Sequence, residues 1–185
     1  EKTKNLILDT LGPAFSGREF DAQECVVELV KDIGSSGNST VIGHDLKVFA
    51  TDAAFANTVL MHSMVHDEYS YANDAHAATV IIPAALAVAE HENNSGKELV
   101  TAVAAGYEIA NRIGRPITPQ AMIRGFRGTS LFGVFGAAVA AGILMKLNAE
   151  QNSHAIGFAA NFAQGLKECT TYGGHDWLFQ AAIAS

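Results

Sequence analysis

The strongest constraint on the fold is one long apolar segment in the second half of the chain. Residues 131–145 contain no charged side chain and many glycines and alanines, which let helices approach each other closely. The segment is shorter than the roughly 20 residues that a membrane-spanning helix needs. We therefore expect a helix that is apolar on all sides and lies at the centre of a bundle of other helices.

Most of the remaining chain shows helical periodicity interrupted by glycine, proline and asparagine. Ser95 and Glu98, for example, form a capping box at the start of one helix. The pattern predicts helices at residues 4–11, 21–33, 52–66, from near 83 to 91, 96–113, a short helix after 119, 130–146, 148–165, and one from 177 onward.

Only one part of the chain has the pattern of β-strands. Residues 39–42 and 46–49 are β-prone segments separated by a turn, and this pattern predicts a short hairpin. The predicted fold class is therefore all-α, a large helical bundle with one short β-hairpin insertion. No linker, repeat or low-complexity segment divides the chain, so a single helical domain is expected over residues 1–185.

Composition limits the possible partners. Hydrophobic residues make up 49% of the chain and charged residues 17%, which suits a packed core. The net charge of −7 argues against nucleic-acid binding, which needs a basic face, but a local cluster of Arg or His can still bind a small anion. Cys25 and Cys169 lie in no CxxC pair, so we expect two reduced thiols.

Two histidines at helical spacing raise the question of a metal. His62 and His66 are four residues apart, so one helix face carries both. The pattern is not HExxH and no cysteine is near, so a helix end with capping or solvent-facing histidines is the favoured interpretation. We therefore expect no metal at these histidines.

Acid–base chemistry is the stronger interpretation of the residues around this helix end. Asp67, Glu68 and His76 lie in or beside a predicted loop next to an apolar helix that can bury them. Burial raises the pKa of a carboxyl group and a neighbouring cation lowers it, so such a cluster can hold an acid and a base near neutral pH. A solvated loop is the alternative.

A glycine-rich bend supplies a candidate anion site. Residues 125–130 lead into the long apolar helix, whose first N–H groups, together with Arg127 and Thr129, can bind a carboxylate. A bend that only allows tight helix packing is the alternative. The segment 172–176, with His175, is either a second substrate loop or a simple turn.

Several segments in order and spacing resemble the N-terminal helical domain of the MmgE/PrpD family, which includes 2-methylcitrate dehydratase, cis-aconitate decarboxylase and iminodisuccinate epimerase. The resemblance implies a helical domain followed by a smaller α+β lid domain, a homodimer, and no metal or organic cofactor. The segments that carry it are 6–12, 57–64, Asp67 with Glu68, His76, 82–90, 95–99, 105–109, 112–114, 125–129 and 132–133.

The lid domain that the resemblance implies has no counterpart in these residues. Its last residues show no cap or turn signal, so we expect a fragment without the lid domain. No signal peptide is visible, and a cytoplasmic location is expected, or the mitochondrial matrix in a eukaryote. Three positions depart from the family's lyases: Val65 replaces an aspartate, Arg127 replaces a histidine, and a lysine expected near Trp177 is absent.

Together these features predict a cofactor-independent lyase of the dehydratase type acting on a small di- or tricarboxylate. Asp67, Glu68 and His76 are the predicted catalytic residues. Predicted to bind substrate are His66, Arg127, Thr129 and His175. An isomerase or epimerase with a similar substrate, or a non-catalytic carboxylate-binding relative, remains an alternative.

Overall fold

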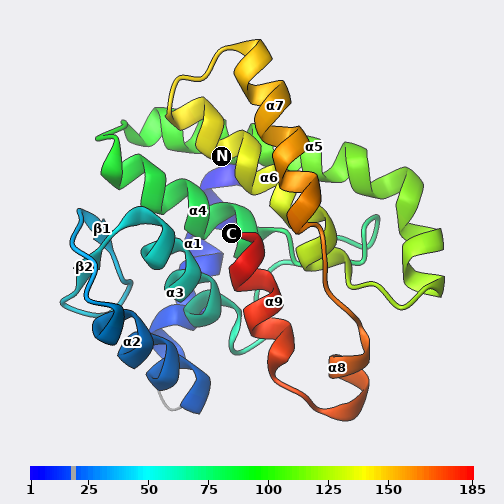
Figure 1. The fold of residues 1–185 in the computed structure, drawn as a ribbon, viewed down its shortest axis with the longest axis horizontal. Helices are drawn as coiled ribbons and strands as arrows, with labels where there is room; N and C mark the ends of the chain where they lie inside the picture. The colour runs from blue at the N-terminus through cyan, green and yellow to red at the C-terminus, as the bar shows by residue number, and fades with distance from the viewer. Residues whose placement is uncertain (18–19) are drawn as a thin grey trace.

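The computed structural model describes residues 1–17 and 20–185, and its elements are mostly helices (Figure 1). In chain order they are α1 (Lys2–Ser16), α2 (Asp21–Ile33), β1 (Ser39–Thr40), β2 (Lys47–Val48), α3 (Ala50–His62), α4 (Ala78–His91), α5 (Gly96–Ile123), α6 (Gly128–Leu144), α7 (Ala149–Ala159), the 3-10 helix η1 (Ala160–Phe162), α8 (Glu168–Tyr172) and α9 (Asp176–Ala184). The predicted all-α class is confirmed.

Helix α6 contains nearly all of the apolar segment 131–145, and it packs against α4, α5, α7 and α9. Glycines allow the closest of these contacts. A Cβ atom on Gly106 of α5 would lie 2.6 Å from the carbonyl oxygen of Gly136 in α6, so side chains at these positions would push the two helices apart. The expected central position of this helix follows from its apolar surface on nearly every side.

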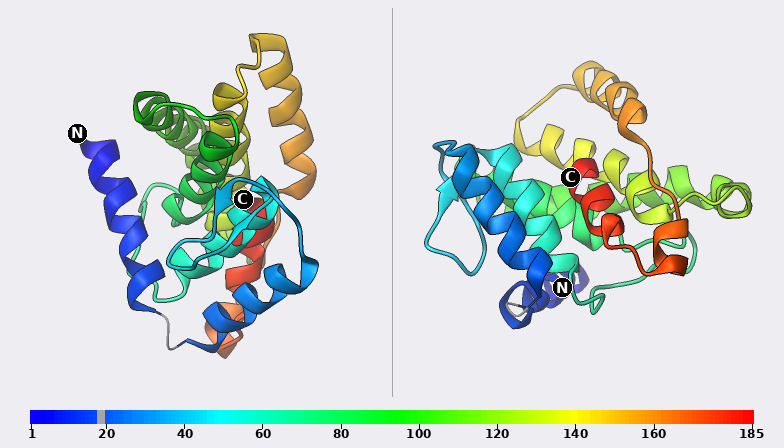
Figure 2. Two further views of the ribbon diagram at one scale, coloured as in Figure 1. Left: turned by 90° about the vertical axis from the view of Figure 1, so that its left-hand side faces the viewer. Right: turned by 60° about the horizontal axis from the view of Figure 1, so that its bottom comes forward.

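The hairpin is confirmed as an antiparallel pair in which Thr40 faces Lys47, although each strand is only two residues long. It packs on α3 and α4 and lies at the opposite end of the molecule from the C-terminal end of α5 (Figure 1; Figure 2, right). The hairpin is therefore a peripheral addition to the bundle.

Two helices continue through prolines at which the sequence predicted an end. Helix α1 passes Pro13 and ends at Ser16, and α5 passes Pro116 and Pro119. A proline removes one helical hydrogen bond, but both prolines of α5 lie on its exposed face, where water can bind the freed carbonyl groups. Packing against α6 then holds the helix together.

Two predicted helices are shorter in the structure. Helix α3 ends at His62 rather than near residue 66, because Val65 adopts a left-handed backbone with φ 53°. Helix α7 ends at Ala159, and a short helix, α8, follows that the sequence did not predict.

These irregular segments create the site. Residues 63–77, between α3 and α4, and residues 163–175, between η1 and α9, both reach the N-terminal end of α6. A bridge between Phe126 and Leu166 ties the glycine bend to the second segment. Among the described residues, no helix combines the length and the hydropathy that a membrane span requires.

Candidate active site

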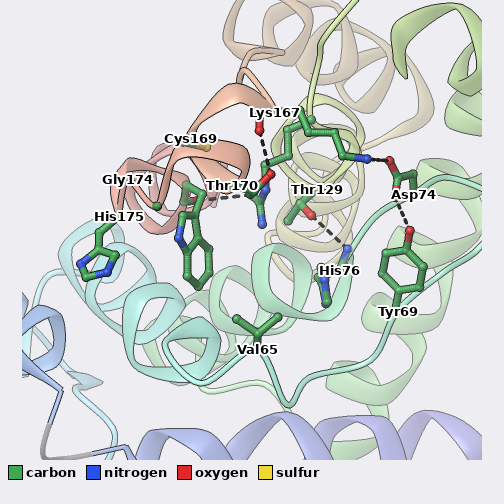
Figure 3. Close-up of a pocket in the computed structure, with 13 residues that line it drawn as sticks. Val65, Tyr69, Asp74, His76, Thr129, Lys167, Cys169, Thr170, Gly174 and His175 are labelled. Carbon is green, nitrogen blue, oxygen red and sulfur yellow. Dashed lines mark hydrogen bonds and ion pairs between the residues drawn. The ribbon is translucent and has the colours of Figure 1, made fainter. Parts of the chain in front are cut away.

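A cavity of about 420 Å³ lies where the two irregular segments meet the start of α6 (Figure 3). Its wall combines ionisable, hydroxyl and apolar side chains from three parts of the chain. The lining residues are Val65, Tyr69, Asp74, His76, Arg127, Thr129, Lys167, Cys169, Thr170, Gly173, Gly174, His175 and Trp177.

Asp67 sits behind this wall and bridges two histidines. Its Oδ1 lies 3.0 Å from Nδ1 of His62, and its Oδ2 lies 2.7 Å from Nδ1 of His76. The carboxyl group is fully buried, whereas His76 is partly exposed to the cavity. With Nδ1 occupied by Asp67, Nε2 is the nitrogen of His76 that remains for a ligand.

The charges of Asp67 and His76 stabilise each other. Burial raises the pKa of Asp67, but hydrogen bonds and charge interactions with the two histidines outweigh it and lower the pKa to about 2. Burial lowers the pKa of His76, and contact with Asp67 more than compensates, so the net shift is upward. Asp67 is therefore an ionised orienting group, and His76 is the group that can exchange a proton near neutral pH.

Arg127 reaches the same network from the other side. Its Nη2 donates to Nε2 of His62 over 2.7 Å, and its Nη1 donates to the carbonyl oxygen of Trp177 over 3.2 Å. Since a guanidinium can only donate, Nε2 of His62 must accept, and the proton of that imidazole is on Nδ1, facing Asp67. Burial lowers the pKa of His62, which agrees with a neutral ring.

Trp177 holds this arrangement in place by ring contacts. Its ring meets His62 edge-on at 4.7 Å between centroids, and the guanidinium carbon of Arg127 lies 5.5 Å from the Trp177 ring centroid. These contacts join the end of α3, the start of α6 and the start of α9, so they fix the Arg127 side chain within the cavity wall.

The first turn of α6 fixes the position of His76. Oγ1 of Thr129 accepts a hydrogen bond of 3.0 Å from the backbone N–H of His76. Gly128 lies against the carbonyl groups of Asn73 and Asp74, at a distance that leaves no room for a Cβ atom. The loop can approach the helix this closely only because residue 128 is glycine.

Glu68 lies outside the cavity lining. Its Oε2 accepts a hydrogen bond of 2.9 Å from the backbone N–H of Ala78, at the start of α4. Burial raises the pKa of Glu68 to about 7, although the bond to Ala78 opposes the shift. Glu68 therefore caps a helix behind the site and does not face a ligand in the cavity.

A second ion pair closes one side of the cavity. Nζ of Lys167 lies 2.6 Å from Oδ2 of Asp74, and the hydroxyl of Tyr69 donates to Oδ1 of the same carboxylate. Figure 3 shows Lys167 extending across the cavity toward Asp74. The pair joins the loop 63–77 to the segment 163–175.

The predicted site residues other than Glu68 divide into three groups. Asp67, His76, Arg127 and Thr129 come together around the cavity as the sequence implied, and His175 lies exposed on its lining. His66 is exposed and does not line the cavity, because the helix that was expected to carry it ends earlier. Its predicted substrate contact has no geometric support.

Sequence reasoning missed several members of the site. His62 was considered only for metal binding, and its place between Asp67 and Arg127 has no local signal except the five-residue spacing to Asp67. Lys167, Asp74 and Tyr69 carry no motif at all. They are brought together by the bridge between residues 126 and 166, which sequence periodicity does not reveal.

One group among the described residues has the spacing of metal ligands: His62, Asp67 and His76. A histidine that binds a metal usually donates from its other nitrogen to an acceptor. His62 has the opposite arrangement, since Arg127 donates to its Nε2. The hydrogen-bonded network therefore fits a carboxylate that serves one neutral and one titrating histidine better than it fits a metal centre.

Comparison with known proteins relates the whole chain to one family. A family model, the MmgE/PrpD N-terminal domain, matches residues 1–185. A cis-aconitate decarboxylase of Aspergillus terreus is 28% identical over 180 residues, which cover 94% of this chain and 36% of that protein. A cis-aconitate decarboxylase of Homo sapiens is 30% identical over 170 residues, covering 88% of this chain and 35% of the relative. The chain thus spans about a third of the length of these curated relatives.

Proposed function

Because this chain belongs to the MmgE/PrpD family, we propose that its cavity is the active site of a lyase that acts on a small carboxylate by acid–base chemistry. The observation that carries the proposal is the placement of His76. Its Nδ1 contacts the buried carboxylate of Asp67, and its ring lines the same cavity as Arg127. A base and a carboxylate-binding cation therefore face one small molecule.

In the proposed reaction, Arg127 binds the substrate carboxylate. Two of its five N–H donors are used by His62 and Trp177, which leaves the others for a ligand. His76 removes a proton from the carbon next to that carboxylate. The negative charge that develops on the carboxylate oxygens is stabilised by Arg127 and by the N–H groups at the start of α6.

The reaction is completed by loss of a hydroxyl group from the adjacent carbon. The C–H electron pair forms a carbon–carbon double bond as the C–O bond breaks, and protonated His76 supplies the proton that converts the leaving group to water. This is a dehydratase-type lyase, in which one histidine acts as base and then as acid. Asp67 stays ionised throughout and stabilises the protonated imidazole.

The relatives' names support a lyase, since cis-aconitate decarboxylase removes a carboxyl group from a carboxylate substrate. The dehydratase subtype is our own proposal, and it is supported by one group in the cavity wall, His76, that can both take up and release a proton. The family resemblance further leads us to propose a homodimer whose lid domain closes over this cavity, which light scattering of the full-length protein tests.

The test of the mechanism is His76→Asn in the full-length protein. The asparagine amide can still donate to Asp67 but cannot exchange protons. Incubation with a panel of 3-hydroxycarboxylates, followed by detection of alkene protons by NMR, should show turnover by the wild type that falls by about 100-fold or more in the variant. The control His154→Asn changes an exposed histidine of α7 and should keep full turnover. Undiminished turnover by His76→Asn would refute the proposed role.

A further inference from the structure

The ring of His62 lies between the two buried charges of the site. Its Nε2 accepts a hydrogen bond of 2.7 Å from Nη2 of Arg127, and its Nδ1 lies 3.0 Å from Oδ1 of Asp67. His62 is the last residue of α3 and is fully buried. One neutral imidazole therefore joins the cation that is proposed to bind the substrate to the carboxylate that orients the base.

Arg127 and Asp67 would pair with each other if this ring were absent. Both residues are only 7% exposed, so water screens the attraction between their charges weakly. Burial lowers the pKa of Arg127, and the negative charge of Asp67 opposes that shift, so the two groups already interact across the imidazole. A direct ion pair would occupy donors of Arg127 and draw the carboxylate of Asp67 away from His76.

Packing holds the His62 ring in this position. The ring of Trp177 meets it edge-on at 4.7 Å between centroids, and the ring of His76 lies against it at 5.1 Å. The preceding residues of α3, Leu60 and Met61, are also fully buried, so the helix end that carries the ring is anchored in the core. A side chain on a rigid, buried element can hold two charged partners at a constant separation.

We propose that His62 is a positioning residue that acts as a spacer: it holds Arg127 in place for a substrate carboxylate and keeps it from pairing with Asp67. This inference rests on the proposed function and adds a residue that does not itself touch the substrate. The spacer must donate at one end and accept at the other, as the Nδ1–H tautomer does. Loss of the ring should therefore impair substrate binding and change the pKa of the base together.

The test replaces the ring by a methyl group in the full-length protein. In His62→Ala, Arg127 can reach Asp67, which leaves fewer donors for the substrate and weakens the stabilisation of protonated His76. KM for the 3-hydroxycarboxylate that the wild type dehydrates fastest should rise by about tenfold or more. The pKa of His76 should fall, so the acid limb of kcat/KM should move to lower pH. A folded variant with the wild-type KM and acid limb overturns the inference.

A conservative variant tests the bridging by hydrogen bonds. The terminal amide of His62→Gln has a donor and an acceptor side by side, so it can join Asp67 to Arg127 as the imidazole does. KM should return to within about threefold of the wild-type value, and the acid limb should return with it. A glutamine variant that behaves like the alanine variant contradicts the role of the hydrogen bonds.

The matched control for packing is Met61→Ala. It also removes a fully buried side chain from the last turn of α3, but one that is not part of the hydrogen-bonded network. Thermal unfolding should show a less stable protein, whereas KM and the acid limb should stay at their wild-type values. Equal shifts in Met61→Ala and His62→Ala would mean that His62 acts through packing alone.

A measurement without substrate separates this inference from the proposed function. NMR titration gives the pKa of His76 in the wild type and in His62→Ala whether or not any compound is turned over. A wild type that dehydrates no compound of the panel refutes the proposed function, whereas a pKa of His76 that does not fall in the variant refutes the spacer. If His62→Ala does not fold, His62→Asn replaces it. Its shorter amide can donate to Asp67 but cannot reach Arg127, so an unchanged KM overturns the inference.

Discussion

Arg127 donates a hydrogen bond of 2.7 Å to Nε2 of His62, and this contact determines where the protons of the site are. Because arginine does not accept hydrogen bonds, His62 is held as a neutral imidazole with its proton on Nδ1. That proton points to Asp67, whose other oxygen is 2.7 Å from Nδ1 of His76. One carboxylate thus serves a permanently neutral histidine and a titrating one.

The protonation of His62 can be observed directly. Long-range proton–nitrogen NMR correlations should show His62 as the Nδ1–H tautomer at pH 6, while His76 is largely protonated, since burial lowers the pKa of His62 and Asp67 raises that of His76. In Arg127→Met, loss of the nearby positive charge should raise the pKa of His62. A doubly protonated His62 in the wild type would contradict the assignment.

The pH dependence of turnover should respond to Asp67. A base must be deprotonated to act, so activity should rise with pH through the pKa of His76. Burial lowers that pKa and Asp67 raises it to a greater extent. In Asp67→Asn the stabilisation of the protonated ring is lost, the pKa of His76 falls, and the acid limb of the profile of kcat/KM should move to lower pH. A limb that stays in place would mean that His76 is not the group being titrated.

Glu68 should make the fold less stable at alkaline pH. Burial raises its folded pKa from 4.5 to about 7, so the folded state binds the proton more tightly than the unfolded state does. The contribution of Glu68 to the free energy of unfolding is then greatest below pH 4.5 and is lost as pH rises through 7, by about 3 kcal/mol in total. Glu68→Gln removes this loss while its amide oxygen can still cap α4. Urea unfolding should show the variant to be more stable than wild type at pH 8 but not at pH 4.5.

Gly128 should tolerate no side chain. A Cβ there would collide with the carbonyl oxygens of Asn73 and Asp74, so Gly128→Ala must push the loop from α6 and displace His76. We expect a loss of about 1–3 kcal/mol in the free energy of unfolding, together with reduced turnover. The control Gly157→Ala lies in α7 with nothing within 4 Å of the added atom, and it should stabilise by roughly 1 kcal/mol. Equal effects of the two substitutions would show that the close approach at Gly128 is unimportant.

The helical bundle could be predicted well from periodicity, but helix ends could not. Prolines 116 and 119 predicted a break in α5, and only the packing of that helix on α6 shows why it continues. The opposite error occurred at Val65, where apolar periodicity predicted helix and the backbone turned left-handed. In α5 a tertiary contact thus outweighed a local preference, whereas the left-handed turn at Val65 has no signal in the apolar pattern.

The sequence by itself determined the all-α class, the burial of most residues between 131 and 144, and the presence of Asp67, His76 and Arg127, since these depend on residue type and spacing. Only the tertiary structure decided that His62 joins Asp67 to Arg127 and that Lys167 is neutralised by Asp74. The physical reason is that charge pairing and hydrogen bonding act over a few ångströms. They therefore depend on which distant segments meet, and here a glycine-dependent contact at the start of α6 brings those segments together.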